Sequence, residues 1–229
     1  MMFRVLRRFL CLLIFLAVSA GALQAQSPSS SSAAKHVKKP AAPFDSTLDP
    51  GTLTSGVYRN KTLALSWKIP EGWVLRTDEM NAREEDKDTP DPAQPPASAA
   101  SSTGAKVLLA AFSRPPEARA EDVNSSILIA AESAAAYPGL KDAAQYFGPL
   151  TEVAKAQGFT MDEDPYEIAV GTKTLVRGDF HKDVGTRVMH QSTLAMLAHG
   201  YAVSITLIAG TEDEVEELID ALTFTPNAK

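Results

Sequence analysis

Cysteine is nearly absent from this sequence, and its single cysteine lies in a segment that we expect to be removed. Cys11 is the only cysteine among the 229 residues. Cleavage of the N-terminal segment would leave a mature chain without disulfides, thiol nucleophiles or thiolate metal sites. The absence of a free thiol also suits an oxidising compartment outside the cytoplasm.

A hydrophobic run long enough to cross a membrane is also missing. The longest apolar stretch, Phe9–Ala22, has 14 residues and follows three arginines. A membrane-spanning helix needs roughly 20 residues, whereas a basic start, a short apolar run and small residues are typical of a signal peptide. We therefore predict a signal peptide over 1–25 and an exported protein, periplasmic or extracellular. A membrane contact is expected only if this segment is retained.

Positive charge is scarce in the rest of the chain. From Phe44 onward there are 16 basic and 28 acidic residues, a net charge of −12. Because the phosphate backbone repels such a surface, we expect no nucleic-acid partner. Segment 26–43 is rich in Ser, Ala, Pro and Lys and is predicted to be a disordered tether. A similar stretch near 84–104 is predicted to be a disordered loop within one domain, 44–229.

Local signatures of catalysis are lacking as well. The sequence has no Gly-x-Ser-x-Gly elbow, and Gly171 and Gly178 are isolated glycines without the pattern of a phosphate-binding loop. We therefore expect no catalytic residues, no cofactor and no enzymatic activity. A hydrolase remains a third possibility, which a pocket joining a serine, a histidine and a carboxylate would favour.

Several segments have the alternation or apolar character of β-strands. Residues 62–69 alternate between apolar and polar side chains, which places Trp67 in the core. Segments 106–112 and 126–131 are short apolar runs, typical of strands buried on both faces. Further strands are predicted over 166–170, 174–180, 187–198 and 201–207. The turns between them fall at Gly171 and at His199–Gly200.

Two segments have the period of amphipathic helices. The first covers about 143–157, contains Pro149, at which we expect a kink, and stops at Gly158. The second begins at a capping box formed by Thr211 and Glu214. Because the later strands are joined by hairpins, the order of elements predicts an α+β fold, an antiparallel sheet flanked by two main α-helices.

Several motifs resemble those of a known family. Segments Gly56–Asn60, Leu65–Trp73, Gly200–Thr206 and Leu222–Phe224 resemble the PsbP-like proteins. The chain as a whole is similar to uncharacterised exported proteins of acidobacteria. The resemblance implies an α/β/α sandwich in which an antiparallel sheet lies between helical layers. It also implies a function in binding other proteins without catalysis, although no partner-binding residues of the family map onto this sequence.

Two histidines form a candidate metal site. If the hairpin pairs Asp183 with Val188, then His181 and His190 are also paired and lie about 5 Å apart on one face of the sheet. Asp183 or Asp179 would add a carboxylate, and such a group suits zinc or copper. A register slip of one residue would separate the pair, and ordinary surface histidines are the alternative interpretation. His36 lies in the tether, and His199 lies at a turn.

Two aromatic residues are candidates for partner binding. Tyr58 and Trp73 would form a groove for a protein partner if they were exposed side by side. The leading hypothesis is an exported, non-catalytic accessory module that binds another envelope or secreted protein. The alternative is a carrier for a small ligand or metal ion, centred on His181 and His190.

Overall fold

The computed structural model describes residues 48–88, 105–118, 120 and 122–225. The predicted signal peptide, the predicted tether and most of the predicted loop near 84–104 lie outside these residues. Within the described part, no helix is both long enough and apolar enough to span a membrane.

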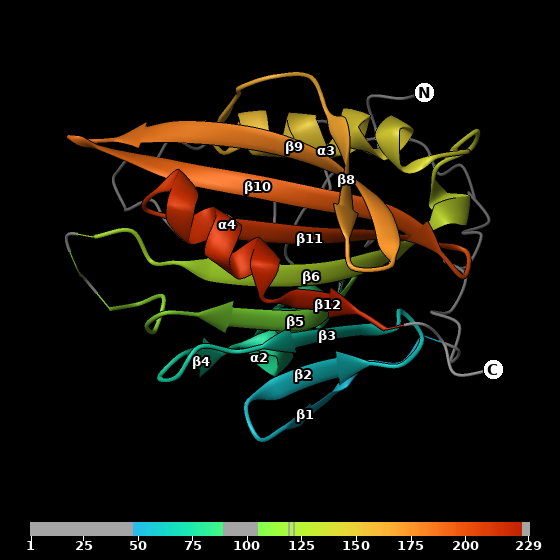
Figure 1. The fold of residues 1–229 in the computed structure, drawn as a ribbon, viewed down its shortest axis with the longest axis horizontal. Helices are drawn as coiled ribbons and strands as arrows, with labels where there is room; N and C mark the ends of the chain where they lie inside the picture. Colours follow the sequence, from blue (N-terminus) through green and yellow to red (C-terminus); the bar gives the residue numbers. More distant parts are fainter. Residues whose placement is uncertain (1–47, 89–104, 119, 121, 226–229) are drawn as a thin grey trace, which may run out of the picture.

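The main element is an antiparallel eight-stranded sheet with the order β4-β5-β6-β11-β10-β9-β7, in which β8 also pairs with β9 (Figure 1). Its strands are β4 Val74–Leu75, β5 Lys106–Phe112, β6 Ser126–Ser133, β7 Thr160–Met161, β8 Tyr166–Val170, β9 Lys173–Val184, β10 Arg187–Ala198 and β11 Tyr201–Ala209. Strands β5 and β6 are buried over most of their length, as the apolar runs 106–112 and 126–131 predict. Strand β11 is buried over its whole length.

A second, four-stranded antiparallel sheet packs on the first, with the order β1-β2-β3-β12. Its strands are β1 Thr52–Thr54, β2 Val57–Asn60, β3 Leu65–Lys68 and β12 Leu222–Phe224. The predicted alternation in β3 is confirmed, because Leu65 and Trp67 are buried while Lys68 is exposed. Strand β12 pairs with β3 from the far end of the chain, with Leu222 opposite Trp67.

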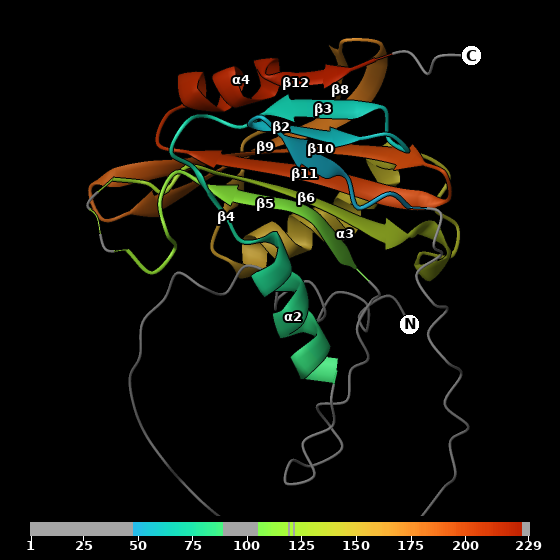
Figure 2. The ribbon, with the colours of Figure 1, turned by 90° about the horizontal axis from the view of Figure 1, so that it is seen from below.

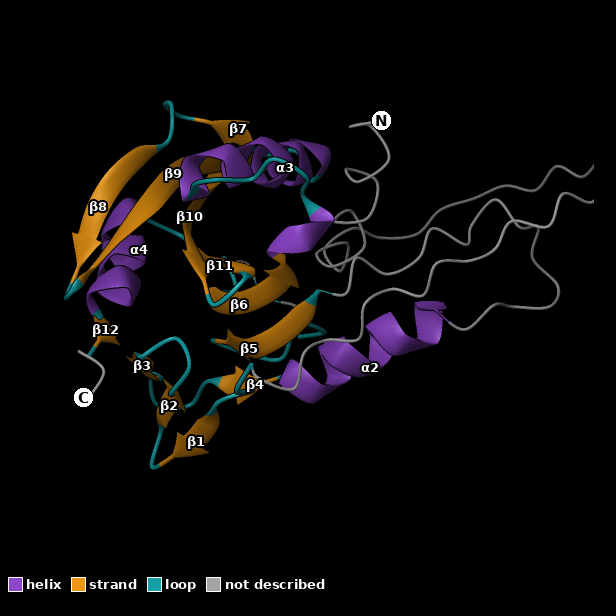
Figure 3. Ribbon diagram, turned by 90° about the vertical axis from the view of Figure 1, so that its right-hand side faces the viewer, coloured by secondary structure: helices purple, strands orange, loops and turns teal. Residues whose placement is uncertain are grey.

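Helices lie on both sides of the eight-stranded sheet. They are α2 Thr77–Asp88, η3 Ala134–Ala136, α3 Ala143–Ala156 and α4 Glu212–Asp220, of which η3 is a single 3₁₀ turn. Figure 2 shows α4 in the same layer as the four-stranded sheet, above the eight-stranded sheet. Figure 3 shows α3 and α2 on the opposite side.

The predicted α/β/α sandwich with two main helices is wrong. The described chain has much more β-strand than helix, and a second sheet together with α4 forms a layer that the prediction gives to a helix alone. Alternation over residues 62–69 identifies a strand but carries no information about its partner, so it does not predict a second sheet. The pairing of β3 with β12 is decided by a contact between distant parts of the chain.

The predicted local signals are largely confirmed. His199 and Gly200 form the turn between β10 and β11, and both have positive φ, as a tight hairpin turn requires. Helix α3 ends just before Gly158, which also has positive φ. Pro149 lies inside α3. At α4, the Glu214 backbone N–H donates to the Thr211 hydroxyl at 3.2 Å, as the predicted capping box requires.

Helix α2 was not expected. Its last residues, from about 84 to 88, were assigned to the predicted loop, but they continue the helix. The helix borders β5, because the Asn81 amide both donates to and accepts from the Val107 backbone at 3.0 Å. The Asn81 amide therefore covers backbone groups that an edge strand leaves unpaired. Because a single side chain makes this contact, no repeating pattern in the sequence predicts it.

Apolar side chains of the described residues form three cores. The largest lies between the two sheets and α4, and it includes Trp67, which is fully buried. The second lies between α3 and the opposite face of the eight-stranded sheet. The third is small and lies between α2 and β5. The eight-stranded sheet is therefore covered on both faces, and its polar side chains lie in two separate environments.

Candidate functional site

The predicted register of the histidine hairpin is confirmed. Asp183 pairs with Val188, and His181 pairs with His190, so the two imidazoles share the face of the sheet that bears α4. This register follows from a short local turn, since β9 and β10 are separated by only two residues. It is therefore the part of the candidate site that local sequence signals specify best.

The two histidines nevertheless have different partners. His181 Nδ1 contacts Asp162 Oδ1, whereas His190 Nδ1 lies 3.7 Å from Glu212 Oε1. Asp183 is exposed near the hairpin turn. Among the described residues, no group of three or more His, Cys, Asp or Glu side chains is placed to hold a metal ion. The geometry therefore does not support the predicted zinc or copper site.

The aromatic candidates for partner binding lie in the core. Tyr58 is only 3% exposed, and its hydroxyl donates to the Pro50 carbonyl at 3.1 Å. Burial is the main cause that raises the pKa of Tyr58 to about 12. Trp73 is half-buried and meets Trp67 edge-on, with ring centroids 5.8 Å apart. These residues stabilise the second sheet, so the expected exposed aromatic groove is not formed.

A cleft of about 280 Å³ lies beside the histidine hairpin, between β8, β9, β10 and α4. Figure 1 shows α4 lying over β10 and β11, with β8 over the neighbouring end of β9. Alternation along β9 places Arg177 and Asp179 on the same face. We call this space the acidic cleft, because five carboxylates line it: Asp162, Glu163, Asp179, Glu212 and Glu216.

Arg177 joins the strands of the acidic cleft to α4. Its Nε lies 2.9 Å from both Asp179 oxygens, and its terminal nitrogen donates to Glu216. Asp179 also accepts hydrogen bonds from Tyr166, at 2.8 Å, and from Ser192. The guanidinium lies over the Tyr166 ring, 6.0 Å from its centroid. The guanidinium of Arg177 therefore holds β8, β9 and α4 together.

These contacts change the acidity of the groups in the acidic cleft. Burial lowers the pKa of Arg177, but its hydrogen bonds to Glu216 and Asp179 outweigh that effect and raise the pKa above its ordinary value. The pKa of Tyr166 is raised to about 12, first by burial and then by the hydrogen bond to the Asp179 carboxylate. At neutral pH Arg177 is therefore charged, and the Tyr166 hydroxyl keeps its proton.

The acidic cleft also brings together a serine, a histidine and a carboxylate. Ser192 donates its hydrogen bond to Asp179, and the described contact of His190 is with Glu212. A serine nucleophile needs a hydrogen bond to its base, and the base needs a second group to orient it. The residue types expected of a hydrolase thus meet here, but their contacts differ from those of a catalytic triad.

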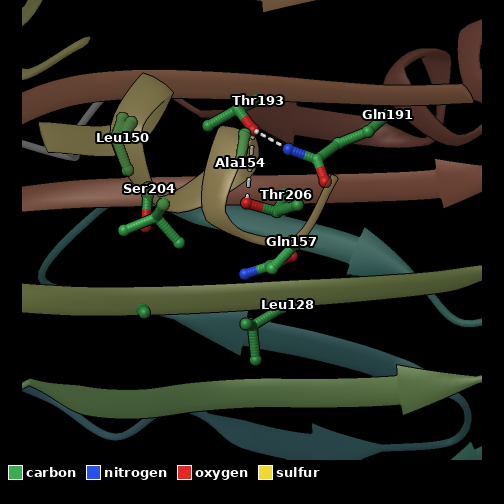
Figure 4. Close-up of a pocket in the computed structure, with 10 residues that line it drawn as sticks. Leu128, Leu150, Ala154, Gln157, Gln191, Thr193, Ser204 and Thr206 are labelled. Carbon is green, nitrogen blue, oxygen red and sulfur yellow. Dashed lines mark hydrogen bonds between the residues drawn. The ribbon is translucent and has the colours of Figure 1, made fainter. Parts of the chain in front are cut away.

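A second polar site was missed from the sequence. Gln191 and Thr193 of β10 and Ser204 and Thr206 of β11 are buried beneath α3, where they line a small pocket (Figure 4). Thr193 contacts both the Gln191 amide and the Thr206 hydroxyl. Alternation within β10 and β11 places these four polar side chains on one face of the sheet. A polar face normally indicates exposure to solvent, and only the position of α3 shows that this face is covered.

A buried carboxyl group lies on the same face of the sheet. Glu132 of β6 is fully buried, and it accepts hydrogen bonds from Tyr137 and from Tyr146, the latter at 2.9 Å. Burial raises the pKa of Glu132 to about 7, although both hydrogen bonds act to lower it. The pKa values of both tyrosines are raised, mainly by burial. No sequence pattern pointed to this group.

No family model matches the chain, and no curated protein matches it. Among solved structures, a Pseudomonas aeruginosa protein of unknown function, described as a candidate regulator, is 16% identical with a TM-score of 0.35, over 49% of this chain and 80% of its own. LpqN of Mycobacterium tuberculosis, which is involved in cell envelope biogenesis, is 15% identical with a TM-score of 0.35. The match covers 78% of this chain and 87% of LpqN. A Bacteroides thetaiotaomicron protein is 11% identical with a TM-score of 0.37. The match covers 77% of this chain and 51% of that protein. The resemblance to PsbP-like proteins stays a prediction.

Proposed function

We propose that this protein is an exported, non-catalytic binding module that holds a basic segment of another envelope or secreted protein in the acidic cleft. The observation that carries the proposal is the charge of this space. Five carboxylates line it, and Arg177 is the one permanent cation among the described lining residues. Asp179 and Glu216 already bind that cation, so further carboxylates are left to attract a basic side chain.

The exposed position of two of these carboxylates favours a partner that docks from solution. The Glu212 side chain is 83% exposed, and Glu163 is also exposed. Charges at the rim of a site act mainly by steering a partner of opposite charge and by setting its register. The contacts of Ser192 and His190, which differ from those of a triad, support a binding role over a hydrolytic one.

Binding of a lysine-rich peptide tests this proposal. The full chain and the double variant Glu163→Gln with Glu212→Gln would be titrated with the peptide by calorimetry, at low and high ionic strength. We expect the double variant to bind several-fold more weakly and to lose most of the salt dependence. Neither substitution removes a contact of Arg177, so folding should be retained.

A matched variant controls for net charge. Glu71→Gln with Glu152→Gln removes the same charge from exposed residues outside the acidic cleft. This control should bind as the unchanged chain does. Equal weakening by the two double variants would mean that overall charge, not the acidic cleft, attracts the peptide. No binding at low ionic strength would overturn the proposal, and hydrolysis of an ester substrate that depends on Ser192 would replace it with an enzyme.

A further inference from the structure

The pocket beneath α3, the polar slot, is lined by polar groups where a helix normally packs on apolar ones. Thr193 and Thr206 face each other across β10 and β11, with their hydroxyl oxygens 3.4 Å apart. Gln191 lies two residues from Thr193 on the same face of β10, and Gln157 faces them from the C-terminal end of α3. Amphipathic helices usually cover aliphatic side chains, so this polar surface requires another explanation.

Each of two side-chain amides in the polar slot has one atom without a hydrogen-bond partner. Gln191 is 5% exposed, and its Nε2 donates to Thr193 at 3.2 Å, but its Oε1 has no partner. Gln157 Nε2 is likewise buried without an acceptor. A buried polar atom left unpaired is destabilising, because it has given up its hydrogen bonds to water. An unmatched acceptor and an unmatched donor in one pocket therefore point to a group that is bound there.

The chemistry of the polar slot restricts that group. It must donate to Gln191 Oε1 and accept from Gln157 Nε2. A carboxylate would face the Gln191 oxygen without a proton to donate, and an ammonium would face the Gln157 amide without a lone pair. No described lining residue carries a charge that would compensate either ion. The group is therefore uncharged, and Leu128, Leu150 and Val153 supply an apolar wall for the carbon atoms next to it.

The size of the polar slot sets a further limit. Its volume is about 20 Å³, so it admits only the small terminal group of a ligand. We propose that the polar slot binds the uncharged terminal hydroxyl or carboxamide of a small aliphatic molecule. This site lies on the opposite face of the eight-stranded sheet from the acidic cleft and shares no charged residue with it. The two proposals can therefore fail independently.

Nuclear magnetic resonance of the ¹⁵N-labelled full chain tests this site. The side-chain amide signals of Gln157 and Gln191 would be followed during titration with acetamide and ethanol. Acetate and ethylammonium serve as charged controls of similar size. We expect saturable shifts of the two glutamine signals with the neutral probes only, because each charged probe leaves one of the two amides unmatched.

Two leucine variants separate binding from folding. Gln191→Leu should weaken acetamide binding about tenfold, since it removes one hydrogen bond. It should not lower the thermal midpoint, because it also removes an unpaired buried group. Gln145→Leu changes an exposed glutamine of α3 and should leave binding unaffected. The variant Glu163→Gln with Glu212→Gln should also bind acetamide normally.

Three results would overturn the proposal. One is a shift that grows linearly for all four probes, which indicates a solvent effect only. Another is an unchanged affinity in Gln191→Leu. The third is a long-lived water molecule in the polar slot that neither neutral probe displaces at high concentration. That result would show that water alone satisfies Gln157 and Gln191.

Discussion

Among the described carboxyl groups, Glu132 is the one that is fully buried. Two tyrosine hydroxyls donate to it, one from Tyr137 directly after η3 and one from Tyr146 of α3. Tyr137 and Tyr146 also contact each other edge-on, with ring centroids 5.3 Å apart. Burial disfavours the charged form, and the pKa of Glu132 rises from 4.5 to about 7.

This shift predicts that Glu132 makes the protein less stable as the pH rises. Between about pH 4.5 and pH 7 the folded protein holds a proton that the unfolded chain releases. The stabilisation is therefore fully present below the unfolded pKa and is lost as the pH rises through the folded pKa. We expect the contribution of Glu132 to the free energy of unfolding to fall by about 2 kcal/mol from about pH 5 to about pH 8.

Urea denaturation of the full chain and of Glu132→Gln over this pH range measures the effect. The glutamine keeps the shape but does not titrate, so the difference between the two proteins isolates the contribution of Glu132. Relative to the unchanged chain, the Glu132→Gln variant should gain stability as the pH rises. At high pH it should match the unchanged chain or exceed it. A difference that stays constant with pH, or grows in favour of the natural chain as the pH rises, would contradict the prediction.

At the scale of elements, the contact between α3 and β9 is set by a glycine. A Cβ atom at Gly178 would lie 2.4 Å from Phe147 Cε1, well inside van der Waals contact. Phe147 belongs to the core between α3 and the sheet. The strand can therefore approach this helix closely only where it has no side chain.

Gly178→Ala should therefore destabilise the protein by about 1–3 kcal/mol, because Phe147 or the helix must move. Gly148→Ala is the control within α3, since a Cβ there meets nothing within 4 Å. That control should cost less than Gly178→Ala, because the added Cβ at Gly148 meets no side chain of the core. Thermal unfolding followed by circular dichroism compares them. Equal midpoints for the two variants would show that the Phe147 contact does not limit the packing of α3.

At the scale of the whole molecule, Trp67 connects the second sheet, α4 and the main core. It is fully buried, pairs with Leu222 across β3 and β12, and donates from Nε1 to the Leu218 carbonyl of α4 at 3.2 Å. Strand β12 is only three residues long. The Trp67 side chain therefore links this short strand pairing to α4 and to the main core.

Trp67→Ala should lower the free energy of unfolding by about 3–5 kcal/mol, from the lost apolar burial and the cavity that remains. Trp73→Ala should cost less, because Trp73 is half-buried. Chemical denaturation followed by far-ultraviolet circular dichroism measures both variants. A smaller loss for Trp67→Ala than for Trp73→Ala would mean that the second sheet is held mainly by other contacts.

Local signals in the sequence determined the hairpins, both helix ends at Thr211 and Gly158, and the register that pairs His181 with His190. These features form between residues close in the chain, where turn geometry and side-chain period are sufficient. The tertiary structure decided the rest. Pairing of Leu222 with Trp67, burial of Tyr58, and the covering of Gln191 by α3 all join distant segments. Periodicity shows which side chains share a face, but only packing decides what lies against that face.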